Sequence, residues 1–345
     1  MKNPLKFIGV LAILFLFILS VPSKRFMAED ENGIGSSSVP EEAFDPYFQN
    51  WLEQDVAYII TNGERIGFKR LATDEERELF ITMFWFRRDP TRDTLENEFR
   101  DEHYRRMVYA NEKFTTDVPG WKTDRGRIYI LLGPPDQIES KPTVGSVPEV
   151  WRYHRVPVSP PDKEVTVEFL DQSRDGNYRL ITDVAMESLL NRVKESYITN
   201  EPGCKASDHS ILCLDVSIVK PPRIRHKELE VALGVKVRYD LLPFKYHLAF
   251  TKVTDATVLT FISIQIKNRD MTYRERFGKM VGTVNLFGRI KDPEESVGRI
   301  REAFEAEIKS EIPKPFFNEM SEGASYYQTA VPLKAGRYKL ELALR

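Results

Sequence analysis

The sequence has few cysteines and no excess of charge of either sign. Its two cysteines exclude a disulfide-rich scaffold and a zinc site made of four thiolates. The 50 Lys and Arg residues are balanced by 52 Asp and Glu residues, which leaves a formal net charge of −2. This balance excludes nucleic-acid binding that depends on a global positive charge, and we expect no nucleic acid among the partners. The 345 residues are enough for two domains of ordinary size.

The sequence signatures of several enzyme classes are also absent. There is no His-Glu-x-x-His zinc motif, no Gly-x-Ser-x-Gly nucleophile elbow and no Gly-x-x-x-x-Gly-Lys phosphate loop. We therefore predict no cofactor, no metal and no catalytic residue. Asp171, Asp175 and Asn177 could ligate calcium, but Asp-Gly-Asn is more typical of a hairpin turn.

An apolar run from Phe7 to Val21 follows two lysines at the N-terminus. Its length is typical of a secretory signal and short for a membrane-spanning helix, which needs ~20 residues. We predict that residues 1–23 are a signal peptide and that residues 24–43, rich in Gly, Ser and acids, are a flexible linker. The protein is then extracytoplasmic, either periplasmic or secreted. The alternative is an uncleaved run, residues 7–21, that anchors the chain in the inner membrane.

The redox state expected for the two cysteines depends on whether the protein is exported. Cys204 and Cys213 are separated by eight residues of polar character, within a predicted linker that spans residues 201–225. In an oxidising compartment a local disulfide between them is favoured over two free thiols. The alternative, a redox-active pair, lacks the Cys-x-x-Cys spacing.

Residues 44–200 are predicted to fold as an α+β domain, in which helices precede a small antiparallel sheet. Helical spacing and capping patterns predict three helices: one from Pro46 to a stop at Asn62-Gly63, one capped by Thr73 and Glu76, and one from Asp93 to Phe114. The period changes after Gly120, and strands are predicted at Arg127–Leu132, Trp151–Val156, Val165–Leu170 and Tyr178–Ile181. A fourth helix is predicted to follow Thr182 or Asp183 and to carry Leu189, Leu190 and Val193.

Residues 226–345 are predicted to form an all-β, immunoglobulin-like sandwich, because apolar residues there recur at every second position. The alternating stretches are Val231–Tyr239, Ile262–Ile266 and Tyr338–Leu344. The last pattern reaches Arg345, so two interpretations stay open. Either the sandwich is truncated and lacks a closing strand, or this strand ends the domain.

One motif points to a known family. Gly120-Trp121-Lys122-Thr123-Asp124 is followed by Arg125-Gly126-Arg127 and then by Gly133-Pro134-Pro135-Asp136. Phe84–Pro90, Asn97–Phe99 and Ala110-Asn111 lie upstream, and Trp151-Arg152-Tyr153 lies downstream. With these motifs, residues 44–200 resemble the GWxTD domain, which is found in exported bacterial proteins. The resemblance implies no established activity and therefore no catalytic residue.

The motif has a structural and a functional interpretation. In the first, Gly120 and Gly126 permit backbone conformations at the junction of helix and sheet, Trp121 seals this junction, and Asp124 closes a turn. In the second, Trp121, Asp124 and Arg125 form a ligand-facing loop whose aromatic ring stacks on a sugar or a peptide, and Trp151 is a fourth candidate binding residue. We favour the first interpretation and expect Trp121 to be mostly buried.

The function expected from these features is binding or structural. We expect an exported, non-enzymatic binding protein or envelope-associated structural protein, with an envelope protein or a glycan as partner. The alternative is an extracytoplasmic hydrolase that acts on glycans or peptides through carboxylates such as Glu98, Glu102 and Asp124. That alternative requires the carboxylates to meet in a concave site. Arg105 and Arg106 follow Glu102 at the spacing of ordinary helix-surface ion pairs, which favours a solvated face.

Overall fold

The computed structural model describes residues 45–140, 147–160, 163–181, 184–198, 222–234, 242–293 and 299–345. The chain divides into a unit from Met1 to Glu42 and a compact unit from Ala43 to Arg345. The predicted signal peptide, the predicted linker 24–43 and the pair Cys204 and Cys213 lie outside the described residues. We call residues 45–198 the helical half and residues 222–345 the sheet half.

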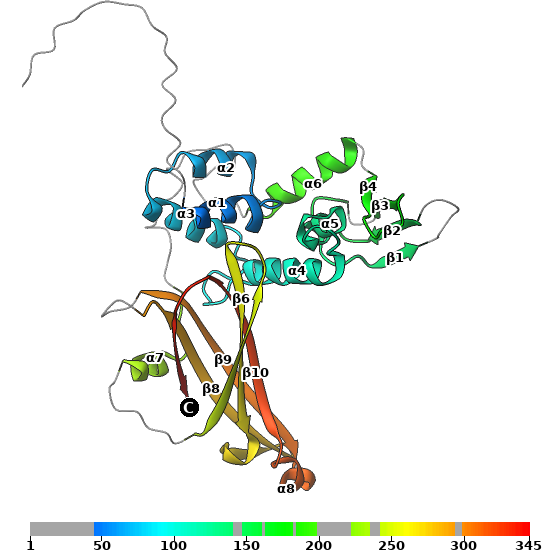
Figure 1. Ribbon diagram of the computed structural model, residues 1–345. Coiled ribbons are helices and arrows are strands. Elements are labelled where there is room, and N and C mark those ends of the chain that lie inside the picture. The colour runs from blue at the N-terminus through cyan, green and yellow to red at the C-terminus, as the bar shows by residue number, and fades with distance from the viewer. Residues whose placement is uncertain are drawn as a thin grey trace, which may run out of the picture. The chain divides into compact units, whose positions relative to one another are not determined.

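The helical half begins with helices, as the sequence predicts (Figure 1). In chain order these are α1 (Pro46–Asn50), the π-helical turn η1 (Trp51–Asp55), α2 (Asn62–Lys69), α3 (Asp74–Phe86), α4 (Glu98–Phe114), the 3₁₀ turn η2 (Gly120–Lys122), α5 (Asp124–Leu132) and, after the small sheet, α6 (Val184–Ser196). The predicted capping box at the start of α3 is confirmed, because Thr73 and Glu76 bond each other's backbone amides. The third predicted helix begins later than expected, at Glu98, because the side chain of Asn97 caps it by accepting from the Arg100 amide at 2.8 Å.

One predicted helix end is wrong. Asn62-Gly63 does not stop a helix but opens α2. The reason is a second capping box, in which the Thr61 hydroxyl accepts from the Glu64 amide at 3.3 Å and the Glu64 carboxylate accepts from the Thr61 amide at 2.9 Å. These bonds satisfy two free amides of the first turn, where a glycine is tolerated.

The small sheet of the helical half is antiparallel, as predicted. Its strands are β1 (Gln137–Ser140), β2 (Val147–Tyr153), β3 (Val165–Asp171) and β4 (Arg179–Ile181), in the order β1-β2-β3-β4. The strand predicted at Arg127–Leu132 is wrong, because these residues belong to helix α5. Ile128, Ile130 and Leu131 are all buried, and a helix that is apolar on every side cannot be told from a buried strand by periodicity.

The sheet half consists mostly of antiparallel strands. They are β5 (Phe244–Lys252), β6 (Thr257–Lys267), β7 (Tyr273–Arg276), β8 (Lys279–Lys291), β9 (Ile300–Pro313), β10 (Ala324–Lys334) and β11 (Lys339–Leu344). One sheet has the order β10-β6-β5, and the other has the order β11-β8-β7 with β9 also paired to β8. Short helical segments accompany them: α7 (Lys227–Leu233), η5 (Asn268–Asp270), η6 (Lys314–Phe316) and α8 (Phe317–Met320).

The strand predicted to begin at Val231 is also wrong, because Val231 and Leu233 lie in helix α7. Glu228 and Glu230 occupy the first turn of α7, where carboxylates interact favourably with the helix dipole. Only Leu229 of this helix is buried, whereas Val231 is 61% exposed. Val231 and Leu233 therefore do not belong to a sheet face, and the rest of this predicted stretch, Val235 to Tyr239, lies outside the described residues.

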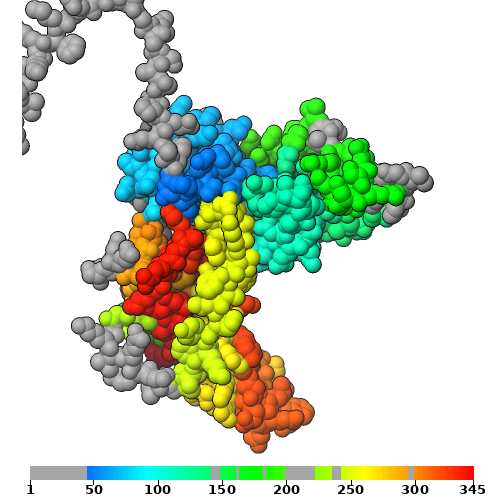
Figure 2. All heavy atoms as spheres, in the orientation of Figure 1, coloured from blue at the N-terminus to red at the C-terminus, as the bar shows by residue number. Residues whose placement is uncertain are grey.

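Two apolar cores stabilise the compact unit. One lies between the two sheets of the sheet half and contains residues of both, such as Ile262 and Ile264 of β6 and Leu286 of β8. The other fills the helical half, yet it also includes Val253, Ala256 and Leu259 from the β5–β6 hairpin. Figure 2 shows this hairpin in yellow against the blue residues near position 50. The sheet half thus contributes side chains to the core of the helical half.

Candidate functional site

The GWxTD sequence forms a very tight contact between α4, η2 and α5. A Cβ atom on Gly120 would lie 1.9 Å from the carbonyl oxygen of Ala110, and one on Gly126 would lie 1.9 Å from the carbonyl oxygen of Gly120. Both distances are far below van der Waals contact, and both obstacles are backbone atoms. Glycine is therefore required at the two positions for packing. Neither glycine has a positive φ, so the conformational role predicted for them is wrong, and close approach of the backbone is the reason for glycine.

Hydrogen bonds within the motif satisfy its polar groups. The Thr123 hydroxyl donates to the carbonyl oxygen of Gly120 at 2.8 Å and accepts from the amide of Gly126 at 3.1 Å, which caps α5. The Asn111 side chain accepts from the Trp121 amide at 3.0 Å and donates to the carbonyl oxygen of Val253 at 2.9 Å. Through Asn111, the motif is joined directly to the β5–β6 hairpin of the sheet half.

Trp121 is 5% exposed, so the prediction that its ring is buried is confirmed. The ring packs edge-on against Tyr58, with centroids 6.2 Å apart, and the Lys122 ammonium group lies 5.1 Å from the indole centroid. A ring of this size buried at a junction contributes mainly apolar contact area.

Asp124 and Arg125 are engaged with the small sheet. The Asp124 carboxylate accepts from the Leu180 amide of β4 at 2.9 Å. The Arg125 guanidinium lies 4.0 Å from the centroid of the Tyr178 ring and donates to the carbonyl oxygen of Gly176 at 3.1 Å. Both side chains thereby hold the β3–β4 connection against the first turn of α5.

Trp151 is connected to Arg125 through a shared acid. The Trp151 indole donates to the Glu149 carboxylate at 2.7 Å, and the Arg125 guanidinium is 3.5 Å from the same carboxylate. The Trp151 ring is buried against Phe114 and Phe169. Arg125 and Trp151 therefore belong to one cluster, whereas Trp121 packs in a different set of contacts.

The carboxylates named for a hydrolase have separate partners. Glu102 pairs with Arg106 at 2.9 Å and also with Arg105, which are the helix-surface ion pairs that the spacing predicts. Glu98 is exposed on the first turn of α4. Asp124 is bound to a sheet amide. No group of three or more His, Cys, Asp or Glu side chains suited to a metal ion is found among the described residues.

A buried ion pair in the helical half was not predicted. The Arg88 side chain is fully buried and donates to both oxygens of Glu64, at 3.0 and 2.8 Å. It also donates to the carbonyl oxygens of Ile59 and Phe84. Burial opposes ionisation of Glu64, but the neighbouring Arg88 guanidinium holds the pKa of Glu64 below its ordinary value. The capping-box spacing from Thr61 to Glu64 is the sequence signal that could have located this acid.

A second unpredicted group, Asp55, lies where the two halves meet. It is buried and accepts hydrogen bonds from the Tyr104 hydroxyl at 2.8 Å, from the Thr257 hydroxyl at 2.5 Å and from the Thr254 hydroxyl. Burial raises the pKa of Asp55 to about 6, although these three bonds favour its ionised form. The ring of His103 contacts the backbone oxygen of Asp55 at 2.7 Å, and burial lowers the pKa of His103 to about 4. Long-range contacts define this cluster, so sequence spacing gives no signal for it.

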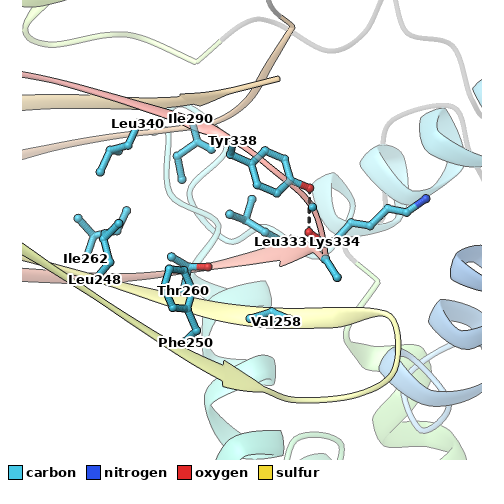
Figure 3. Close-up of a pocket in the computed structure, with 12 residues that line it drawn as sticks. Leu248, Phe250, Val258, Thr260, Ile262, Ile290, Leu333, Lys334, Tyr338 and Leu340 are labelled. Atoms are coloured by element: carbon cyan, nitrogen blue, oxygen red, sulfur yellow. Dashed lines mark hydrogen bonds between the residues drawn. The ribbon is translucent and has the colours of Figure 1, made fainter. Parts of the chain in front are cut away.

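The sheet half contains an apolar hollow of about 420 Å³ between its two sheets (Figure 3). We call it the apolar hollow. Its lining residues are Leu248, Phe250, Val258, Thr260, Ile262, Ile290, Leu333, Lys334, Ala335, Gly336, Tyr338 and Leu340. The Tyr338 hydroxyl closes one end by donating to the carbonyl oxygen of Lys334 at 2.8 Å, while the Lys334 ammonium group points outward to Asp45 at 3.1 Å.

The inner face of β5 remains open at the apolar hollow. Leu248 and Phe250 are paired with Ile262 and Thr260 of β6, so all four side chains are on one face of the sheet. Ile262 and Thr260 are buried, but Phe250 is 65% exposed. The volume is within the ~300–1,000 Å³ range of small-molecule pockets, which are mostly apolar. This hollow is a candidate for a ligand site in the described part of the chain.

Comparison with known proteins identifies the helical half only. The family model of the GWxTD domain matches residues 27–197. No curated protein and no solved structure matches the chain. Among the described residues, no helix combines the length and the apolar character that a membrane span requires. The matched residues include the turn built by Gly120, Trp121 and Thr123, and the chain is therefore a GWxTD domain-containing protein.

Proposed function

We propose that this protein is an exported, non-enzymatic binding protein of the bacterial envelope. In this proposal the GWxTD domain is a rigid support, and the sheet half is an immunoglobulin-like sandwich that receives an apolar group of an envelope component. The apolar hollow carries the proposal, because it combines a ligand-sized volume with a lining in which Lys334 is the one charged residue.

The contacts of the motif support a structural role for the GWxTD domain. Trp121 and Trp151 are buried, and Asp124 and Arg125 are bound to the small sheet. To bind a ligand, any of these four side chains would first have to break its contacts within the domain. The hydrolase alternative receives no comparable support, since Glu102 is engaged in surface ion pairs.

Binding of an apolar probe tests the proposal. We expect anilinonaphthalene sulfonate to bind the folded protein and to fluoresce there. Leu248→Trp places a larger side chain in the apolar hollow and should weaken this binding about tenfold or more, which corresponds to ~1.4 kcal/mol. His247→Trp is the matched control, because His247 is exposed on the opposite face of β5.

Thermal unfolding of both variants shows whether the fold is retained. Should Leu248→Trp unfold, Ala335→Trp at the exposed rim of the hollow replaces it. Equal probe binding by the wild type and a folded hollow-filling variant would refute a ligand site in the hollow.

Export is the other part of the proposal. It is supported by the apolar run from Phe7 to Val21, which has the length of a signal sequence. Fractionation of cells that express the full chain, and of cells that express it without residues 1–23, tests this. The full chain should be recovered outside the cytoplasm and the shortened chain inside it. Recovery of both in the cytoplasm would contradict export.

A further inference from the structure

The turn between β7 and β8 has an unusual occupant. Phe277 has φ of +50° and the following Gly278 has φ of +74°, which match the two central residues of a type I′ hairpin turn. Asn, Asp and Gly are favoured there, whereas a bulky residue is strained at positive φ. Phe277 is also completely exposed, at 104% of the reference area. Its ring therefore adds no buried apolar area to the described part of the fold that would account for its place in the turn.

Further apolar side chains surround this turn. The carbonyl oxygen of Gly278 accepts from the Lys314 amide at 3.0 Å, so η6 lies beside the hairpin. The rings of Tyr273 and Phe317 are 4.9 Å apart and join the hairpin to α8. Both segments lie at the end of the sheets marked by α8 in Figure 1. The exposed apolar residues of this end, which we call the apolar tip, are Phe277, Pro313, Pro315, Phe316 and Met320.

The charges next to the apolar tip are mainly positive on the hairpin. Lys314 pairs with Glu275 at 2.7 Å, and Lys279 pairs with Glu311 at 3.1 Å. Arg274 and Arg276 are exposed on β7, and neither has a carboxylate partner among the residues that the structure describes. Glu319 of α8 and Glu322, which pairs with Arg269 at 3.4 Å, are further acids nearby. The hairpin therefore presents an aromatic ring directly after two exposed arginines of β7, which could contact an anionic surface.

The apolar tip is far from the contacts between the two halves. It adjoins Gly323, which precedes β10, whereas Lys334 at the other end of β10 pairs with Asp45. The eleven residues of β10 correspond to roughly 35 Å of extended chain. The helical half consequently does not cover the tip through these contacts.

We propose that the apolar tip binds the surface of an anionic lipid bilayer. Phe277 and Phe316 would enter the boundary between headgroups and acyl chains, and Arg274 and Arg276 would contact anionic headgroups. A protruding turn suits a fluid interface, because insertion there needs no complementary cavity. Apolar insertion combined with Lys and Arg is how peripheral segments bind such surfaces. The strain at Phe277 is consistent with a residue retained for contact outside the fold.

Vesicle flotation tests this proposal. The chain is used from Lys24 onward, because the apolar run before it would bind lipid by itself, and the compact unit from Ala43 to Arg345 stays complete. The wild type should float with vesicles of phosphatidylcholine and phosphatidylglycerol and bind phosphatidylcholine alone more weakly. Absence of binding to the anionic vesicles would overturn the proposal.

The informative variant is Phe277→Asn, since asparagine suits the first central position of a type I′ turn. We expect an unchanged or higher Tm together with binding weakened at least about tenfold. Arg276→Gln should weaken binding about fivefold. Val184→Asn, at an exposed apolar residue of α6, is the control and should bind as the wild type does.

Equal vesicle binding by folded Phe277→Asn and the wild type would overturn the proposal. So would a change in oligomeric state on ultracentrifugation without a change in vesicle binding, because the tip would then be a contact between copies of the chain. Neither result depends on the apolar hollow, which Leu248→Trp tests separately.

Discussion

The two halves differ in where they place aromatic residues. In the helical half, Trp51, Phe84 and Trp121 are buried in a continuous core. In the sheet half, Phe287 and Phe304 are buried, but Phe250 and Phe277 are exposed, the first beside the apolar hollow and the second at a turn. The family motif therefore marks a place of close packing, and the two surfaces that we propose as binding sites lie in the half that carries no motif. Experiments on binding should therefore begin with the sheet half and not with the GWxTD motif.

The largest expected effect comes from Gly126→Ala. The added methyl group would meet the carbonyl oxygen of Gly120 at 1.9 Å, and neither backbone can move without displacing a helix. We expect a loss of stability above about 5 kcal/mol, beyond the ~1–3 kcal/mol of ordinary overpacking. Chemical denaturation measures it.

Gly67→Ala is the matched control for this substitution. The nearest atom to its added Cβ would be 3.9 Å away, an ordinary contact in helix α2. It should be neutral or stabilise by up to about 1 kcal/mol. Similar stabilities for the two variants would show that the close contact of α4, η2 and α5 is not needed.

A smaller effect is expected from Arg88→Met. This substitution removes the main cation from buried Glu64, leaving Arg87 at 2.9 Å as its other ion-pair partner. Breaking one side of a buried pair costs about 3–5 kcal/mol. Arg289→Met in the sheet half is the comparison, because its pair with Glu341 lies nearer the surface. Equal losses in urea unfolding would show that the depth of burial does not determine the cost of breaking these two ion pairs.

The smallest of the three effects concerns Asp55 and pH. The pKa of Asp55 is raised by burial to about 6, above its ordinary value of 3.8. The ionised carboxylate therefore lowers stability above pH ~6, and the loss, up to about 3 kcal/mol, is relieved as the pH falls towards 3.8. His103 acts in the opposite direction, because burial lowers its pKa to about 4 and stability is lost as the pH falls from ~6.5.

Because these trends oppose each other, Asp55→Asn must be compared with the wild type across the pH range. The variant lacks the Asp55 titration. As the pH falls from 7.5 to 5, the free energy of unfolding of the wild type should therefore rise relative to that of the variant. A difference that stays constant with pH would show that Asp55 does not titrate in this range.

Local signals in the sequence predicted the elements that local bonds determine. The capping box of Thr73 and the alternating residues of β6 are examples. Helix α5 was predicted as a strand because burial on all sides removes its periodicity. The α2 start was missed because Asn62-Gly63 resembles a turn until the bonds between Thr61 and Glu64 are known.

The candidate site was less predictable than the fold. The close packing at Gly120 and Gly126 depends on contacts with backbone ten and six positions earlier in the chain, which the motif does not show, although the motif itself points to both positions. The apolar hollow depends on the separation of two sheets, and no residue pattern encodes that separation directly. Asp55 has no signal in the sequence, because its partners Thr254 and Thr257 lie about two hundred positions later in the chain.

The β5–β6 hairpin has a consequence for how the protein folds. Val253 and Ala256 complete the core of the helical half, and Asn111 and Asp55 find their partners on the same hairpin. A chain that ends near residue 200 would keep the family domain but expose part of this core and leave a buried carboxylate short of two donors. The smallest cooperative unit is thus larger than the family domain. The core of the helical half is complete only when residues some sixty positions beyond residue 197 are in place.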